Sequence, residues 1–111
     1  MMNIETQELG KATLVKVSGE VDMSNSPKVR EILMDLTKKK VSGIVVDLGE
    51  VSYVDSSGIA TLVEGLQETN TYGGKFHLAS LSPKVQQVFD LAKLSDVFEI
   101  FPDAAGAEEG I

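Results

Sequence analysis

Apolar residues recur along this chain at two spacings, one typical of strands and one typical of helices. Strands are predicted at residues 13–18, 44–48, 75–79 and 97–101, where alternating or continuous apolar residues lie between turn residues. Three helices are predicted where apolar residues recur at i, i+3, i+4 and i+7. Their stripes are Val29, Ile32, Leu33 and Leu36, then Ile59, Leu62, Val63 and Leu66, and finally Val85, Val88, Phe89 and Ala92.

The residues flanking these stripes predict where the helices begin and end. Ser26-Pro27 and Ser82-Pro83 each predict a start, with serine as the cap and proline at the first helical position. The second helix is expected to begin around residues 56–58 and to end at Gly73-Gly74. The lysines at 38–40 complement the dipole at the end of the first helix.

The order of the elements predicts an α/β fold with a mixed, mostly parallel sheet. Residues 44–48 are almost entirely apolar, as in a strand buried on both faces, and the loop after them is expected to span residues 49–55. Residues 3–9 are expected to form an edge strand antiparallel to 13–18. The alternation of strands and helices that follows implies right-handed crossovers.

A chain of 111 residues fits one domain, residues 1–111. Its tail from about residue 103, rich in alanine, glycine and glutamate, is expected to be a frayed helix or disordered.

Composition narrows the classes of function. The absence of cysteine excludes disulfides, thiolate metal sites and a cysteine nucleophile, and with a single histidine no metal site is expected. A net charge of −7 argues against a nucleic-acid partner. The start of the chain does not resemble a signal peptide, and no apolar run approaches the roughly 20 residues of a membrane helix. A cytoplasmic protein without a membrane partner is therefore expected.

The segment most suggestive of chemistry runs from Asp47 to Ala60 and joins a buried strand to the start of a helix. Loops at the carboxyl ends of strands often form sites in such sheets, and a helix N-terminus favours an anion. A hydroxyl there would gain a charge of about −1.5 to −2 on phosphorylation. Asp-Ser-Ser before an apolar stripe is also ordinary helix capping, and composition alone favours capping.

The segment from Val51 to Ile59 (Val-Ser-Tyr-Val-Asp-Ser-Ser-Gly-Ile) resembles the phosphorylation motif of bacterial anti-sigma factor antagonists, the STAS family. The chain departs from the family's usual pattern at Gly58-Ile59-Ala60, often Gly-Leu-Gly, and at Ala92-Lys93-Leu94, often Ser/Thr-Gly-Leu. The resemblance covers almost the whole chain, because it extends to Gly19-Glu20-Val21-Asp22, Ser26-Pro27, Gly73-Gly74-Lys75 and Ser82-Pro83-Lys84-Val85 with Phe89.

The resemblance implies a STAS-type single domain with helices packed mainly on one face of the sheet, and a phosphate-controlled switch rather than an enzyme. Ser56 matches the phosphorylated residue, and its implied neighbours are Asp22, Asp55, Ser57 and Gly58. The unphosphorylated form would bind an anti-sigma factor that is also a serine kinase, so that the sigma factor is released. Phosphorylation would end that binding, and a PP2C-type phosphatase would reverse it. The chain itself would need no cofactor and is expected to be a monomer.

The surface that binds the kinase is hypothesised to comprise the loop at residues 22–25, the Ser56 region and the exposed face of the following helix. The partner-binding residues are then Asp22, Ser24, Asn25, Glu64, Gln67 and Glu68.

Met23 and Met34 are interpreted as side chains that fill gaps in the core.

Two alternatives stay open at this point. The first is a non-switching STAS scaffold in a signalling or lipid-transport assembly. The second is a small enzyme with Ser56 as nucleophile, which would need His77 beside it because Ser56 lacks the Gly-x-Ser-x-Gly elbow. His77 is instead interpreted as an ordinary edge or half-buried residue of a strand.

Overall fold

The five strands of this protein pair in the order in which they occur in the chain. A computed structural model describes residues 2–111. β1 runs antiparallel to β2, and the pairs β2–β3, β3–β4 and β4–β5 are parallel, which confirms the predicted mixed, mostly parallel sheet. The elements are β1 (Asn3–Glu8), β2 (Thr13–Val21), α1 (Ser26–Lys38), β3 (Gly43–Val54), α2 (Ser56–Thr71), β4 (Lys75–Ala79), α3 (Pro83–Leu91), β5 (Glu99–Phe101) and α4 (Ala104–Glu109).

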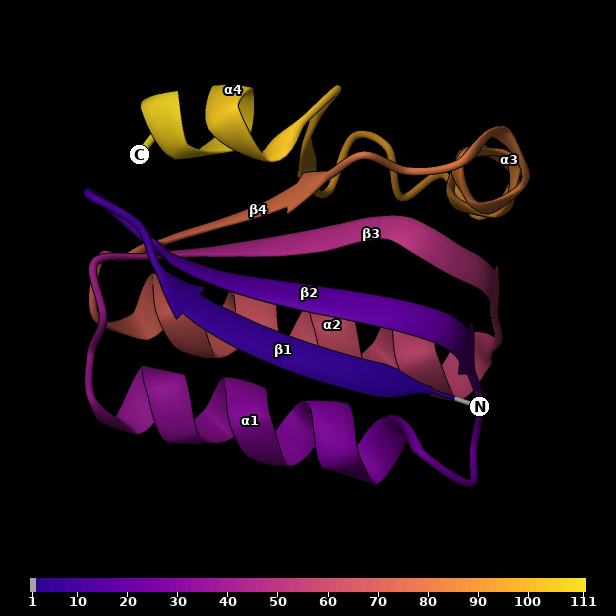
Figure 1. Cartoon of the computed structure of the whole chain (residues 1–111), viewed down its shortest axis with the longest axis horizontal. Helices are drawn as coiled ribbons and strands as arrows, with labels where there is room; N and C mark the ends of the chain where they lie inside the picture. Colours follow the sequence, from indigo (N-terminus) through magenta and orange to yellow (C-terminus); the bar gives the residue numbers. More distant parts are fainter. Residues whose placement is uncertain (1) are drawn as a thin grey trace.

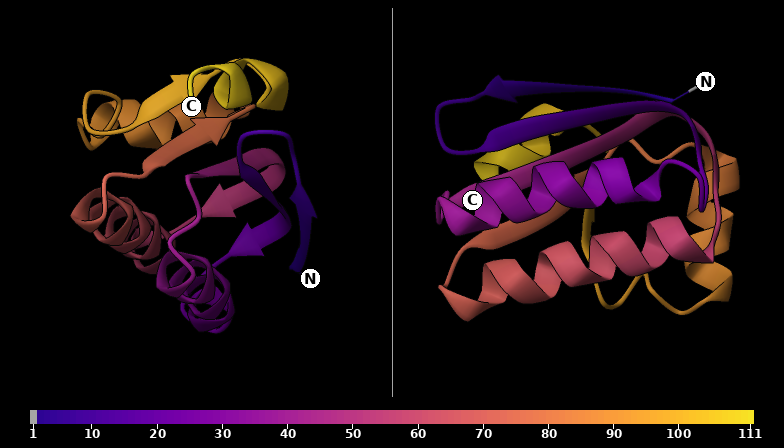
Figure 2. Two further views of the ribbon diagram at one scale, coloured as in Figure 1. Left: turned by 90° about the vertical axis from the view of Figure 1, so that its left-hand side faces the viewer. Right: turned by 90° about the horizontal axis from the view of Figure 1, so that it is seen from below.

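The two long helices, α1 and α2, lie side by side on one face of the sheet, and α4 lies on the other (Figures 1 and 2). α3 packs beside the C-terminal part of β3. The expectation that helices pack mainly on one face is thus confirmed, with the short α4 as the opposite layer.

Burial on both faces of β3 follows from this layering. Ile44 and Val46 belong to the main core beneath α1 and α2, whereas Val45 packs in a smaller cluster with Ala79 and Ala107. All three β3 side chains have 0% exposure. The continuous apolar sequence therefore reports a strand covered by helices on each side.

β3 is longer than predicted, and the loop expected at residues 49–55 is wrong. The strand continues to Val54 because β2 runs beside it to Val21, with shifts of register at Lys16/Ser18 and Gly19/Glu20. The shifts break the simple alternation that the sequence would show in a regular strand. Val51 and Val54 nevertheless bury their side chains.

Of the two expectations for the tail, a frayed helix or disorder, the structure has a short helix, α4, at Ala104–Glu109. Asp103 caps α4 by accepting a hydrogen bond of 2.7 Å from the Gly106 amide. Ala107 is completely buried, because α4 places it in one apolar cluster with Val45 and Ala79.

The expectation that His77 is an edge or half-buried residue is also wrong. β4 lies between β3 and β5, and His77 is 2% exposed beneath α4. Its Nδ1 lies 2.9 Å from the Ala107 carbonyl oxygen, which can only accept a hydrogen bond. The neighbouring ring of Phe101 packs against the imidazole at a centroid distance of 4.8 Å.

Two predicted helix boundaries differ from the structure. Ser82 caps α3 as predicted, by accepting from the Val85 amide, but Ser26 does not cap α1. Asn25 occupies the cap position there, and Ser26 is the buried first residue of the helix. Ala92 is exposed rather than part of the apolar stripe, because α3 ends at Leu91.

Candidate functional site

The N-terminus of α2 is capped by the carboxylate of Asp55. One oxygen, Oδ1, accepts from the Ser57 amide at 2.9 Å, from the Gly58 amide at 3.2 Å and from the Ser57 hydroxyl at 2.6 Å. The hydroxyl bond, together with the backbone amides, lowers the pKa of Asp55 against an opposing effect of desolvation. Asp55 is therefore the charged cap, and it occupies the amides that an anion would otherwise use.

The two serines after the cap differ sharply. Ser56 is the exposed first residue of α2, whereas Ser57 is half-buried and its hydroxyl is bound to Asp55. Among residues 2–111 the Ser56 hydroxyl has no hydrogen-bond partner. Of the pair, Ser56 is the one whose oxygen is free to react with a partner in solution.

Gly58 lets α2 sit directly on the ends of β2 and β3. A Cβ atom at this position would lie 2.8 Å from Cγ1 of Val21 and 3.1 Å from Cγ1 of Val54. The amide of Asp55 also donates to the Val21 carbonyl oxygen at 3.1 Å. The start of the helix is thereby fixed to the sheet, and with it the position of Ser56.

Three polar side chains fold the loop between β2 and α1. Asp22 Oδ1 accepts from the amide of Ser24 at 2.9 Å and also from its hydroxyl. Asn25 accepts from the Asp22 amide at 2.9 Å and donates to the Glu20 carbonyl oxygen at 2.8 Å. The loop begins directly after Val21, whose carbonyl oxygen accepts the bond from the Asp55 amide, so its first residue lies beside the start of α2.

Along α2, the residues predicted to bind a partner fall into two groups. Gln67 and Glu68 are exposed. Glu64 is held by Arg30 of α1 through two bonds, 2.8 Å from Nε and 2.7 Å from Nη2. This pairing raises the pKa of Arg30 and lowers that of Glu64, so Glu64 serves the contact between α1 and α2.

Sequence reasoning missed two apolar residues at this end of the sheet. Met23 is 77% exposed, so its interpretation as a core residue is wrong, whereas Met34 is partly buried against the core as expected. Tyr53, near the end of β3, is 47% exposed. The available signal was position alone, since both residues lie within three residues of a predicted site residue.

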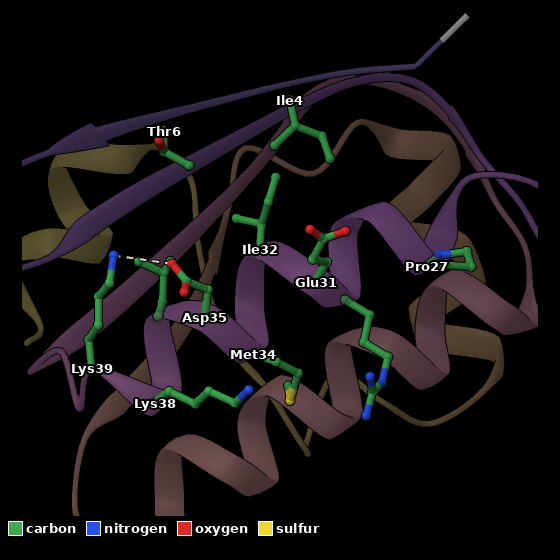
Figure 3. Close-up of a pocket in the computed structure, with 11 residues that line it drawn as sticks. Ile4, Thr6, Pro27, Glu31, Ile32, Met34, Asp35, Lys38 and Lys39 are labelled. Carbon is green, nitrogen blue, oxygen red and sulfur yellow. Dashed lines mark ion pairs between the residues drawn. The ribbon is translucent and has the colours of Figure 1, made fainter.

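The groove between β1 and α1 does not include Ser56 among its lining residues. It has a volume of about 640 Å³, and in it Ile4 faces Ile32 and an ion pair joins Lys39 to Asp35 at 3.1 Å (Figure 3). Within residues 2–111 no cluster of three His, Cys, Asp or Glu side chains could hold a metal ion. In the same part of the chain, the helices are too short or too polar to cross a membrane.

The nucleophile alternative fails on geometry. His77 is buried beneath α4, where Nδ1 contacts the Ala107 carbonyl and Nε2 lies 3.4 Å from Glu99. Neither ring nitrogen is directed at Ser56. A serine–histidine pair is therefore not formed.

Comparison with known proteins places this arrangement in a family context. Residues 3–107 match the family model of the STAS domain. An anti-sigma-B factor antagonist of Staphylococcus aureus is 30% identical over 99 residues, which are 89% of this chain and 92% of that protein.

Solved structures share the fold. An anti-sigma factor antagonist from Mycobacterium paratuberculosis superposes with a TM-score of 0.91 at 21% identity, over 100% of this chain and 94% of that one. The anti-sigma factor antagonist SpoIIAA in its unphosphorylated form gives a TM-score of 0.84 at 20% identity, over 98% of each chain. Its phosphorylated form, from Bacillus, gives 0.77 at 17% identity, over 96% of this chain and 97% of that one.

Proposed function

Because the chain belongs to the STAS domain family, we propose that it is an anti-sigma factor antagonist whose binding to an anti-sigma factor is controlled by phosphorylation of Ser56. The observation that carries the proposal is the contrast between two adjacent hydroxyls. Ser56 is exposed and unpartnered at the start of α2, whereas Ser57 is bound to Asp55. The names of the relatives support the antagonist role.

In the proposed cycle, the unphosphorylated protein binds an anti-sigma factor that is also a serine kinase, and the sigma factor is released. The kinase then transfers the γ-phosphoryl group of ATP to Ser56 Oγ, which loses its proton, and ADP leaves. The phosphorylated chain binds the kinase poorly. A PP2C-type phosphatase hydrolyses the phosphate ester with water and restores the hydroxyl.

The electrostatics of the site give the phosphate a large effect on binding. Asp55 already occupies the amides of Ser57 and Gly58, so a phosphate on Ser56 would find the usual helix N-terminal donors taken. It would add a charge of about −2 beside the carboxylate of Asp55. A difference of about 1.4 kcal/mol at an interface is tenfold in affinity, and desolvating such a dianion against a partner readily exceeds it.

The proposed binding surface comprises the loop at residues 22–25, the Ser56 region and the exposed side chains of Gln67 and Glu68. Glu64 contributes less than its position suggests, because Arg30 holds both of its carboxylate oxygens. A charge reversal at Glu68 is expected to weaken binding of the kinase.

The proposal is tested by incubating the chain with each anti-sigma factor kinase of the source organism and ATP, followed by mass spectrometry that localises the phosphate. Wild type and Ser57→Ala should be modified on residue 56, and Ser56→Ala should not be modified. Phosphate on another residue in wild type would refute the assignment. A chain that carries no phosphate on Ser56 in cells, yet still assembles with partners, would favour the non-switching scaffold.

A further inference from the structure

Exposed apolar side chains flank the Ser56 site. Within residues 2–111 four large hydrophobic side chains are exposed: Met23 at 77%, Tyr53 at 47%, Leu91 at 78% and Val97 at 49%. Met23 lies in the loop after β2, and Tyr53 lies near the end of the adjacent strand β3. Two of the four thus belong to the segments that adjoin the start of α2.

We propose that Met23 and Tyr53 are the apolar anchors of the interface with the anti-sigma factor, a role that rests on the function proposed above. A phosphate on Ser56 controls binding only if Ser56 lies inside the interface or at its rim. The loop that carries Met23 begins after Val21, whose carbonyl oxygen accepts a hydrogen bond from the Asp55 amide at 3.1 Å, and Tyr53 precedes Asp55 by two residues. We therefore expect a partner that covers Ser56 to reach these side chains as well.

Both anchors are held in place before the partner arrives. Asp22, Ser24 and Asn25 bind one another and the Glu20 carbonyl, which fixes the backbone around Met23. Tyr53 is fixed by the pairing of β3 with β2, where it lies opposite Glu20. Because the backbone is already ordered, binding costs little backbone conformational entropy, and the remaining entropic cost is that of fixing the two side chains.

This geometry changes the role of the polar loop residues. The side chains of Asp22, Ser24 and Asn25 each form hydrogen bonds inside the loop, so their main role in this proposal is to position Met23. Tyrosine and methionine are enriched at the centres of protein interfaces, where a few residues carry most of the binding energy. Methionine also adapts its shape to an irregular pocket.

The chemistry of the surface specifies what the partner presents. Met23 and Tyr53 call for an apolar pocket, and the carboxylates of Glu20, Asp22 and Asp55 around them call for basic residues at its rim. Burying the apolar anchors removes water from the neighbourhood of Ser56. A dianion at that position would have to be desolvated together with them. The apolar side chains would therefore favour binding, and the phosphate would oppose it.

The experiment measures the affinity of each purified anti-sigma factor kinase of the source organism for single-residue variants by titration calorimetry without ATP. Met23→Ala and Tyr53→Ala are each expected to weaken binding at least about tenfold, and the double variant more. Leu91→Ala is the matched control, because Leu91 is exposed to the same degree as Met23 but lies on α3. Thermal unfolding of the same samples verifies that all variants are folded.

The outcomes separate this inference from the function on which it rests. If wild type binds none of the kinases, the proposed function fails. If wild type binds and Ser56 phosphorylation abolishes binding, but Met23→Ala and Tyr53→Ala bind as wild type does, only the anchor assignment is overturned. Equal losses for Leu91→Ala and Met23→Ala would likewise overturn it, since exposed apolar surface in general would then carry the effect.

Discussion

A single methyl group added at Gly58 should disturb the packing of the start of α2, which carries Ser56, on β2 and β3. A Cβ atom there would lie 2.8 Å from Val21 Cγ1 and 3.1 Å from Val54 Cγ1, well inside the roughly 3.5–4.0 Å of ordinary carbon contacts. Val21 and Val54 are paired in adjacent strands and buried, at 5% and 4% exposure. Both are β-branched and stiff, so neither can move aside at little cost.

Two effects of opposite sign determine the result of Gly58→Ala. Replacing glycine by alanine in a helix stabilises it by up to about 1 kcal/mol. Forcing a methyl group into a packed core typically costs about 1–3 kcal/mol. Because the closest contact is with a rigid side chain, we expect the second effect to prevail, with a net loss of up to about 2 kcal/mol and a fall in Tm of roughly 4–8 °C for each kcal/mol lost.

A double-mutant cycle identifies the cause. In Val21→Ala the offending Cγ1 is gone, and the Val21 Cβ lies at an ordinary 3.5 Å from the added methyl. Urea unfolding should show that Gly58→Ala costs less stability in this background, where only the 3.1 Å contact with Val54 Cγ1 remains, with a coupling energy of at least about 1 kcal/mol. A Gly58→Ala protein as stable as wild type, or effects of the two changes that simply add, would refute the steric argument.

Three further predictions concern other contacts. Because the pKa of Asp55 is lowered in the folded protein, its charge stabilises the fold fully above the unfolded-state pKa of about 3.9, and this stabilisation is lost as pH falls through the lowered value. The Tm difference between wild type and Asp55→Asn should therefore shrink on acidification. A Tm difference that stays constant with pH would contradict this. His77→Ala should destabilise the protein by at least about 2 kcal/mol and speed amide hydrogen exchange in α4, because it removes a buried ring and its bond to the Ala107 carbonyl oxygen. Unchanged hydrogen exchange in α4 would argue against this contact. Arg30→Gln should lower the Tm only slightly, and about 1 M salt should abolish the Tm difference from wild type, since the side chains of Arg30 and Glu64 are both partly exposed. A large loss of Tm that does not depend on salt would contradict this description of the ion pair.

The parts of the fold that were predictable are those set by local spacing. The stripe through Val29 and Leu33 identified α1 by its helical period. The apolar run at residues 44–48 identified a strand covered on both faces, because it is short and rich in β-branched residues. The second half of β3 was missed, since the shifts of register with β2 and the exposed Gly49 and Glu50 mimic a loop. Its burial depends on where β2 ends, which lies some 30 residues away in the sequence.

Small residues conceal tertiary contacts in the same way. Ala107 looks unremarkable in a tail of alanine and glutamate, yet its small volume is what allows α4 to approach Val45 and cover His77. The burial of His77 therefore could not be inferred without α4. At the site, the Asp55 cap followed from local chemistry, whereas the bond between Arg30 and Glu64 joins residues 34 positions apart and has no local signature.

The cap at Asp55 also constrains how a phosphate on Ser56 can act. If helix N-terminal amides were free, they would neutralise part of the new charge, and the modification would tighten the fold as much as alter the surface. Here the amides of Ser57 and Gly58 are bound to Asp55, and the Asp55 amide is bound to the Val21 carbonyl oxygen, which holds the start of α2 on the end of β2. A phosphate on Ser56 would consequently stay at the surface beside another carboxylate. The free-energy cost of desolvating the phosphate would then arise only when a partner binds, so the affinity for the partner should change far more than the stability of the fold.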